Sequence, residues 1–197
     1  MDFVQPIRDP KKIAQIKNQL KGAARFRDLL LFVMGINTAL RISDLLNLTI
    51  GQLVDERGAI RQTFTIKEEK RGKRNVVTIN ASIREALALY LTEFEAIQAN
   101  PAHFVFFSTK HADHDYTRPL TRERAWQLVS QMCRAAGLSG NYGTHTLRKT
   151  WGYHARKSGV PMEIIMEKLN HTSFAMTKRY LGITDDELRQ TAENLNL

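Results

Sequence analysis

The sequence predicts one mainly α-helical domain with a small antiparallel β-hairpin, and three observations support this fold class. The length of 197 residues suits a single domain. Apolar residues recur at helical spacing along most of the chain, and only two neighbouring segments, 60–66 and 75–79, are rich in β-branched and apolar residues. With 43% hydrophobic and 25% charged residues, the chain can bury a core.

Capping signals and apolar spacing define the elements of the first quarter of the chain. Asp9-Pro10 is typical of a helix start, with aspartate as the N-cap and proline at the first helical position, and Gly22 ends this helix. Residues 23–37 predict a second helix that is apolar on most sides, so we expect it in the centre of the core. Ser43 can cap the brief helix that follows.

The two β-rich segments are joined by Glu68–Arg74, a basic stretch that contains Gly72. This arrangement predicts a hairpin with a basic tip. Helical periodicity resumes at residues 83–94 and again after Thr121. The helix after Thr121 is expected to place on one side Trp126, Val129, Met132 and Cys133.

Three further helix starts are marked by residues that cap or begin helices. Thr144 can cap a helix that runs to about residue 157, Pro161 can begin another, and Ser173 can cap a short one. The pattern Thr184-x-x-Glu187 is a capping box for a tail helix. We therefore expect one domain in residues 1–182 and an acidic tail helix in residues 183–197.

The charge of the chain is large and unevenly placed. The net charge of the chain is +9. The last 17 residues have a net charge of −3, so the residues before them are strongly basic. A basic excess of this size indicates a polyanionic partner, either nucleic acid or an anionic membrane surface, although some basic proteins have neither.

Membrane and disulfide chemistry receive little support from the sequence. Cys133 is the only cysteine, which excludes an intramolecular disulfide and favours an intracellular location. The most apolar stretch, residues 29–36, is shorter than the roughly 20 residues that span a bilayer. We therefore expect a nucleic-acid partner and no membrane.

The residues that carry chemistry form an ordered set rather than a local motif. Taken alone, each has an ordinary structural role, such as packing for a tyrosine or ion pairing for an arginine. Together they supply a nucleophile, two guanidinium groups, a general acid and two imidazoles, which are sufficient to break and rejoin a phosphodiester without a metal. The set consists of Arg41, Lys70, His145, Arg148, His171 and Tyr180.

Four segments that contain these residues resemble the motifs of the tyrosine recombinases, the phage-integrase family. HxxR alone is a weak motif, but four segments in order, covering about residues 23–182, are a specific signal. The segments are Thr38-Ala-Leu-Arg41-Ile-Ser-Asp-Leu-Leu-Asn-Leu48, Lys70-Arg-Gly-Lys73-Arg-Asn-Val-Val-Thr-Ile79, His145-Thr-Leu-Arg148, and Leu169-Asn-His171 with Tyr180 nine residues later.

This resemblance implies the catalytic-domain fold of the DNA breaking-rejoining enzymes and the activity of a site-specific recombinase of the integrase or invertase type. Such an enzyme is a DNA strand transferase that works through a covalent 3′-phosphotyrosyl intermediate, with neither a cofactor nor a metal. It further implies four protomers on two double-stranded DNA sites that exchange C-terminal segments, and it allows a monomer in the free state. The expected location is the cytoplasm, on the nucleoid of a prokaryote or with a phage genome.

The resemblance also gives each residue of the set a role. Tyr180 is the expected nucleophile, and Arg41 and Arg148 are expected to hold the phosphate with donors that stay charged at any working pH. His145 exchanges a proton with the tyrosine. Lys70 protonates the leaving 5′-oxygen.

Two further positions complete the expected site. His171 donates a hydrogen bond to the phosphate, and Asp44 orients a catalytic side chain. Lys73, on the same hairpin tip as Lys70, is the main competitor for the role of general acid. Asn170 stands where the family usually has glycine, and asparagine tolerates the left-handed backbone that glycine would supply.

DNA contacts are expected to be dominated by phosphates and therefore to weaken steeply with salt. The candidate contacts are Lys67, Arg71, Lys73, Arg74, Arg122, Arg124, Lys149 and Lys178.

Other interpretations remain open at the level of sequence. A non-catalytic DNA-binding regulator with the same fold, a nicking and relaxing enzyme of the type IB topoisomerase kind, and a membrane-surface protein are the alternatives. His111, His114 and Asp115 lie close together, but no matching ligand cluster supports a metal site. Most members of the resembled family carry an N-terminal DNA-clamping domain, and fewer than 25 residues precede the first core helix here. We therefore expect no clamping domain in this sequence, as in either a minimal recombinase or a catalytic-domain fragment.

Overall fold

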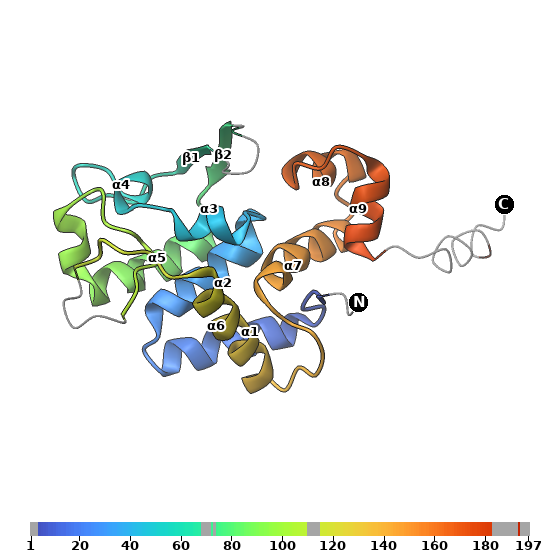
Figure 1. Ribbon diagram of the computed structural model, residues 1–197, viewed down its shortest axis with the longest axis horizontal. Coiled ribbons are helices and arrows are strands. Elements are labelled where there is room, and N and C mark those ends of the chain that lie inside the picture. Colours follow the sequence, from blue (N-terminus) through green and yellow to red (C-terminus); the bar gives the residue numbers. More distant parts are fainter. Residues whose placement is uncertain (1–3, 68–71, 73, 110–114, 183–192, 194–197) are drawn as a thin grey trace.

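The structure, a computed structural model, describes residues 4–67, 72, 74–109, 115–182 and 193. Figure 1 shows helices gathered around α2, with a two-stranded hairpin on one side and α8 and α9 together at one end. The elements in chain order are α1 (Pro10–Gly22), α2 (Phe26–Thr38), α3 (Ile42–Leu46), α4 (Ile50–Leu53), β1 (Thr63–Lys67), β2 (Arg74–Thr78), α5 (Ala81–Glu93), the 3₁₀ helix η1 (Glu95–Ala99), α6 (Arg122–Ala135), α7 (Thr144–Lys157), α8 (Met162–Lys168) and α9 (Phe174–Leu181). The predicted class, mainly helical with one small antiparallel sheet, is confirmed.

The core is built around α2, as its apolar sequence predicts. Every residue from Leu29 to Gly35 is buried, and α2 packs against α1, α5 and α7. A helix that is apolar on all sides is stable only when other elements cover it on all sides. This central helix therefore fixes the position of α7, which carries two of the expected catalytic residues.

Two glycines allow α7 to lie unusually close to its neighbours. A Cβ atom on Gly35 of α2 would come within 2.5 Å of the Leu147 side chain of α7. On the other side, a Cβ on Gly152 of α7 would come within 2.7 Å of Leu181 of α9. Because real Cβ atoms do not approach this closely, both contacts require glycine, and they hold α2, α7 and α9 in one packed unit.

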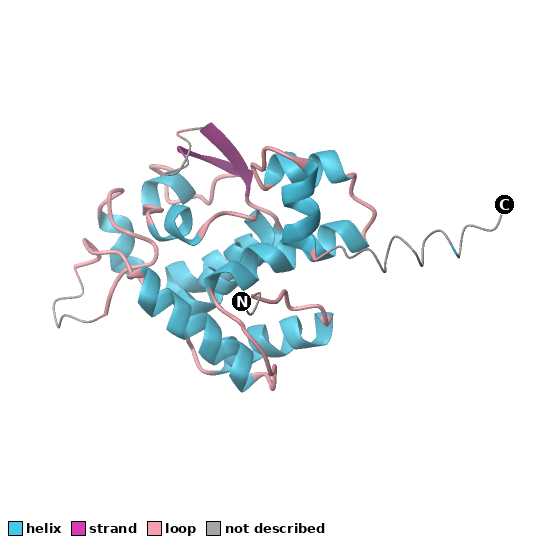
Figure 2. Ribbon diagram, turned by 45° about the vertical axis from the view of Figure 1, so that its right-hand side comes forward, coloured by secondary structure: helices cyan, strands magenta, loops and turns pink. Residues whose placement is uncertain are grey.

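The hairpin joins the core by one face only. β1 and β2 pair antiparallel, with Thr63 opposite Thr78 and Lys67 opposite Arg74. Phe64, Ile66 and Val77 are buried against the core, whereas Val76 on the other face is 59% exposed. Figure 2 shows the hairpin and the α8–α9 pair on the same side of the molecule, and a cleft of about 300 Å³ runs between β2 and α8.

The helix starts and faces agree only partly with the sequence-based predictions. Asp9, Thr121 and Ser173 cap their helices through their side chains. The caps predicted at Ser43 and Thr144 are wrong, because the N-cap residues are Arg41 and Gly143.

The predicted face of α6 is also only partly correct. Val129, Met132 and Cys133 are buried, as expected from their spacing. Trp126 is 51% exposed, because the buried stripe of the helix is centred on Ala125 and Leu128.

The segment before α1 is hydrogen-bonded to α7. The Ile7 amide donates to the Thr150 hydroxyl at 2.9 Å, and the His154 ring nitrogen Nε2 lies 3.0 Å from the Ile7 carbonyl. The Gln5 amide donates to the Asn141 carbonyl at 2.9 Å, and Ile7 itself is fully buried. Residues 5–7 therefore stabilise the outer side of α7.

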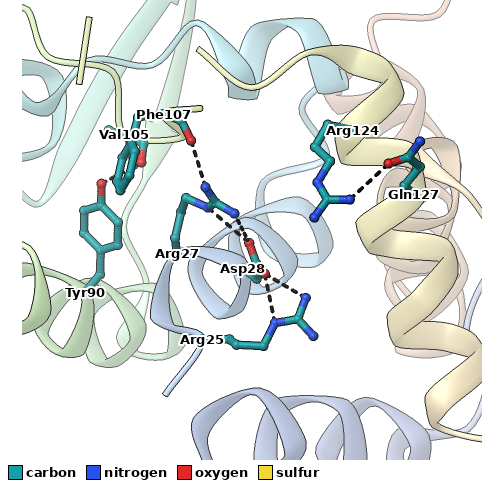
Figure 3. A network of polar contacts seen from close by, with 8 residues as sticks. All are labelled: Arg25, Arg27, Asp28, Tyr90, Val105, Phe107, Arg124 and Gln127. Carbon is teal, nitrogen blue, oxygen red and sulfur yellow. Dashed lines mark hydrogen bonds and ion pairs between the residues drawn. The ribbon is translucent and has the colours of Figure 1, made fainter. Parts of the chain in front are cut away.

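A buried carboxylate fixes the start of α2. Asp28 accepts hydrogen bonds from Arg25 and Arg27, with nitrogen–oxygen distances of 2.8 and 3.0 Å for its two oxygens. Arg27 also donates to the Phe107 carbonyl at 2.9 Å, and Figure 3 shows the whole network. Both oxygens of the 5% exposed Asp28 side chain are thus satisfied by charged donors.

We predict that Asp28→Asn lowers the free energy of unfolding by about 1.5–3 kcal/mol, because two charge-assisted hydrogen-bond sets lose their acceptor charge in a buried place. Urea unfolding followed by circular dichroism measures this. The matched control is Glu85→Ala, which breaks the exposed Lys21–Glu85 ion pair and should cost less than about 1 kcal/mol. Equal losses in the two variants would contradict the role given to Asp28.

Candidate active site

The centre of the site is the buried guanidinium of Arg148, which projects from α7 and is only 6% exposed. It donates one hydrogen bond to the Ala39 carbonyl, at the end of α2, and another to the Leu169 carbonyl, after α8. A guanidinium carries five N–H donors, so these two bonds do not exhaust it. Arg148 therefore joins three segments that are far apart in the sequence.

Both acceptor carbonyls lie where the chain turns through the left-handed region. Ala39 has a φ of 59° and ends α2, and Arg41 follows as the N-cap of α3. Leu169 precedes Asn170, whose φ is 47°. The prediction that asparagine supplies a left-handed turn before His171 is confirmed, and this turn directs the chain toward α9.

Tyr180, the expected nucleophile, lies on α9 with its hydroxyl oxygen buried. Within the part of the chain that the structure describes, this oxygen has no hydrogen-bond partner of good geometry. Burial raises the pKa of Tyr180 to about 12, while the charge of Arg148, a hydrogen-bonding contact from its side chain and the charge of Arg41 act in the opposite direction. A buried phenol close to two guanidinium groups is suited to react with a group that those guanidinium groups bind.

The ring of Tyr180 contacts the side chains of His171 and Lys149 and a small apolar cluster. The His171 ring meets it edge to face, with centroids 5.0 Å apart, and the Lys149 ammonium lies 5.2 Å from its centroid. Trp151 and Leu181 pack beside it over the buried Leu169. The Lys149 side chain, expected to contact DNA, is thus also a neighbour of the nucleophile.

The orientation of His171 depends on a residue that the sequence did not single out. Its ring nitrogen Nδ1 lies 3.0 Å from the hydroxyl of Thr177, which is fully buried and donates in turn to the Ser173 carbonyl at 3.3 Å. The Thr177 hydroxyl can accept from Nδ1–H or donate to Nδ1, according to the tautomer of His171. The only signal in the sequence is a threonine four residues after a helix cap.

His145 lies in the first turn of α7 and keeps solvent contact. Partial desolvation by the surrounding chain lowers the pKa of His145, and the positive charges of Arg148, Lys149 and Arg41 lower it further. An imidazole with a lowered pKa is neutral near pH 7 and can accept a proton. The electrostatics therefore place His145 in the same cluster as both arginines and give it the character of a base.

The remaining expected residues are located unevenly. Asp44 is buried in α3, one turn after Arg41. Lys70, Arg71 and Lys73 lie outside the described residues, as do His111 and His114. The exposed candidates for DNA contact are Lys67 and Arg74 at the ends of the strands, Arg122 and Arg124 at the start of α6, and Lys178 on α9.

Tyr180 also borders an open cleft of about 1190 Å³. The walls of this cleft come from the segment before α1, the loop between α6 and α7, and the end of α9. Three basic side chains line it, namely Arg8, Lys149 and Arg179, against one acidic side chain, Asp9. Tyr180 is therefore next to a basic recess.

The described part of the chain contains neither a candidate metal cluster nor a candidate membrane-spanning helix. No group of three or more histidine, cysteine, aspartate or glutamate residues there is placed to hold a metal ion. None of the helices described is long and apolar enough to cross a membrane.

Comparison with known proteins agrees with this geometry. The family described as the phage integrase family matches residues 8–187. A probable integrase/recombinase, YoeC of Bacillus subtilis (strain 168), is 32% identical over 96% of this chain and 95% of its own length. The tyrosine recombinase XerD of Corynebacterium glutamicum is 28% identical over 83% of this chain but only 51% of its own length.

Solved structures show the same fold. The crystal structure of XerA recombinase matches 98% of this chain and 65% of its own, with a TM-score of 0.73 and 18% identity. XerH recombinase, in a post-cleavage complex with the palindromic difH substrate, matches 96% of this chain and 51% of its own, with a TM-score of 0.74 and 22% identity. This chain therefore spans nearly all of YoeC but only about half to two thirds of the Xer recombinases.

The fold and the site define a catalytic domain of the tyrosine recombinase type. The match over most of the chain shows that it belongs to the phage integrase family. The predicted class of enzyme, a tyrosine-type site-specific recombinase, is confirmed by these relatives. The assignment of individual residues stays a prediction.

We predict that NMR titration of the DNA-free protein gives His145 a pKa below the ordinary value of about 6.5. Lys149→Gln should raise this pKa, because removing a neighbouring cation favours the protonated ring. Lys178→Gln removes an equal charge from α9 that does not act on His145, and should leave it unchanged. A Lys149→Gln variant that titrates like the wild type would contradict the proposed cluster.

Proposed function

We propose that this protein cleaves and rejoins double-stranded DNA at specific sites through a covalent bond between Tyr180 and a 3′-phosphate. The observation that carries the proposal is the convergence of the Tyr180 hydroxyl with the Arg148 and Arg41 charges, which come from three separate parts of the chain. Two guanidinium groups beside a phenol can hold a phosphodiester and stabilise the charge that grows on its oxygens during attack.

The proposed cleavage step is balanced by two proton transfers. The Tyr180 oxygen forms a bond to phosphorus, and the bond from phosphorus to the 5′-oxygen breaks. A tyrosine phenol is protonated at neutral pH, and burial, which raises the pKa of Tyr180 to about 12, favours the protonated form further. His145, whose lowered pKa keeps its ring neutral, is proposed to accept that proton. Lys70 is proposed to give a proton to the departing 5′-oxygen, and a 5′-hydroxyl of another strand reverses the step.

Phosphate contacts outside the cleavage point are proposed for the exposed basic residues. Lys67 and Arg74 flank the tip of the hairpin, and Arg122 and Arg124 begin α6. Together with Lys178 of α9 they belong to a body that is strongly basic. Binding should therefore weaken steeply with salt, because each neutralised phosphate releases counterions. A location on the nucleoid follows from this proposal and stays a prediction.

A second copy of the chain is proposed as a further partner. The last 17 residues carry a net charge of −3, and the cleft beside Tyr180 is lined by Arg8, Lys149 and Arg179. Opposite charge favours a docked acidic segment in this cleft. Exchange of these segments within a tetramer on two DNA sites would make the environment of Tyr180 depend on assembly.

The first experiment is covalent trapping. We predict that the protein, without divalent metal, forms an adduct with nicked duplexes that cover the DNA flanking its gene, because the short strand released beside the nick cannot rejoin. Tyr180→Phe should bind the same DNA and form no adduct, since only the nucleophilic oxygen is lost. Denaturing electrophoresis of labelled DNA measures both.

Three outcomes would contradict the proposal. An adduct that persists in Tyr180→Phe would remove Tyr180 as nucleophile. Salt-sensitive binding without any adduct would indicate a non-catalytic DNA-binding regulator. Relaxation of plasmids that lack a specific site would instead indicate an activity of the type IB topoisomerase kind.

We further predict that Arg8→Glu weakens assembly on paired DNA sites, because it reverses one basic charge in the cleft that would hold the acidic segment. Light scattering of the protein–DNA complex measures the number of protomers. Arg134→Glu, at the exposed end of α6 and outside the cleft, is the matched control for the change in net charge. Wild-type complexes that stay monomeric on each site would contradict the docking.

A further inference from the structure

Trp126 is a large apolar residue that the fold leaves exposed, and the proposed chemistry gives it no role. It lies in the second turn of α6, outside the buried stripe of that helix, and half of its surface meets solvent. An indole that is half exposed contributes less to a core than a buried one. Its position calls for an explanation other than packing of the core.

The indole packs against the residue that leads into α7. A Cβ atom placed on Gly143 would lie 2.6 Å from Cδ1 and 2.7 Å from Nε1 of Trp126. The edge of the indole therefore touches the backbone of Gly143, at the N-cap position of α7. His145 is the second residue of that helix. Trp126 therefore contacts the chain only two residues before His145.

A second contact from the same face of α6 holds the same segment. Ser130, four residues after Trp126, donates from its hydroxyl to the Tyr142 carbonyl at 2.7 Å. Residues four apart on a helix lie above one another, so Trp126 and Ser130 act together on residues 142–143. Within the segment itself, the Gly143 amide donates to the Thr146 hydroxyl at 3.0 Å.

We propose that Trp126 is a positioning residue, which holds the first turn of α7 so that His145 stays aligned with Tyr180 for proton transfer. The proposal rests on the proposed role of His145 and deepens it. The indole fixes the entry of the chain into α7 from one side, while Arg148, one turn further on, anchors the helix to Ala39 and Leu169. His145 lies between these two restraints.

The test compares Trp126→Ala with Trp126→Phe and with Gln131→Ala, an exposed residue further along α6. Cleavage is measured in a single turnover with DNA saturated by protein, and affinity is measured separately with the same substitutions in a Tyr180→Phe background. We expect Trp126→Ala to slow cleavage by about 10- to 100-fold, because small misplacements of a reacting group have effects of that size. Affinity should change less than about threefold, Trp126→Phe should retain most of the rate, and Gln131→Ala should match the wild type.

A double-mutant cycle separates positioning of His145 from a general effect on the fold. If Trp126 acts through His145, the variant Trp126→Ala/His145→Ala should cleave no more slowly than His145→Ala alone. Multiplied losses in the double variant would overturn the proposal. So would a wild-type rate for Trp126→Ala, or a loss of rate explained wholly by weaker binding.

Gly143→Ala tests the same contact from the other side. The new methyl group collides with the indole, so Gly143→Ala should slow cleavage. The double variant Gly143→Ala/Trp126→Ala should cleave no more slowly than Trp126→Ala alone. Independent effects of the two substitutions would count against a shared contact.

A readout without catalysis distinguishes failure of this inference from failure of the proposed function. The His145 ring resonances are followed by NMR in wild type, Trp126→Ala and Gln131→Ala, without DNA. We expect Trp126→Ala alone to shift these resonances and the titration midpoint of His145. An unchanged His145 overturns the positioning role, whereas a wild-type protein that forms no adduct on any DNA overturns the proposed function and leaves the NMR result to decide on Trp126.

Discussion

The buried guanidinium of Arg148 is the interaction on which the rest of the site depends. It binds the carbonyls of Ala39 and Leu169, and each of these lies at a left-handed turn that re-aims the chain. Arg41 follows the first turn in the chain, and His171 and then α9 with Tyr180 follow the second. A planar donor with several N–H groups in fixed directions can make such a bridge, whereas a lysine in its place has no fork to span two carbonyls. The packing of these segments and the proposed chemistry therefore both depend on the Arg148 side chain.

Burial and charge shift the pKa values of the two groups proposed to exchange a proton, Tyr180 and His145, in opposite directions. Tyr180 sits in an apolar cluster that keeps its phenol protonated, so the free protein does not carry a standing phenolate. His145, more exposed and surrounded by cations, is held neutral and ready to accept a proton. Two groups whose pKa values are pushed in opposite directions are a common arrangement where one must give a proton and the other take it. Arrival of a phosphate between them would be the event that connects the two.

The sequence predicted the parts of the site that depend on residue type and order. The tyrosine, the two arginines and the histidines were chosen because this chemistry needs those side chains, and their roles stay predictions. The left-handed backbone at Asn170 was expected because the family usually has glycine there. Thr177, Trp126 and the contact of Lys149 with the tyrosine ring were not, because each depends on where one helix lies against another. The cap at Thr144 was wrong because the Thr146 hydroxyl bonds back to Gly143, which makes glycine the N-cap.

The most direct test of the central claim is the structure of the protein with nicked DNA and orthovanadate, whose five-coordinate form imitates the phosphorane. The account predicts Tyr180 Oη as one axial ligand, with the guanidinium groups of Arg41 and Arg148 on the equatorial oxygens. It also predicts that Arg148 keeps its bonds to the Ala39 and Leu169 carbonyls while it binds vanadate. Vanadate bound away from Tyr180, or an Arg148 that must release both carbonyls to reach it, would contradict the claim that one side chain organises both the fold and the site.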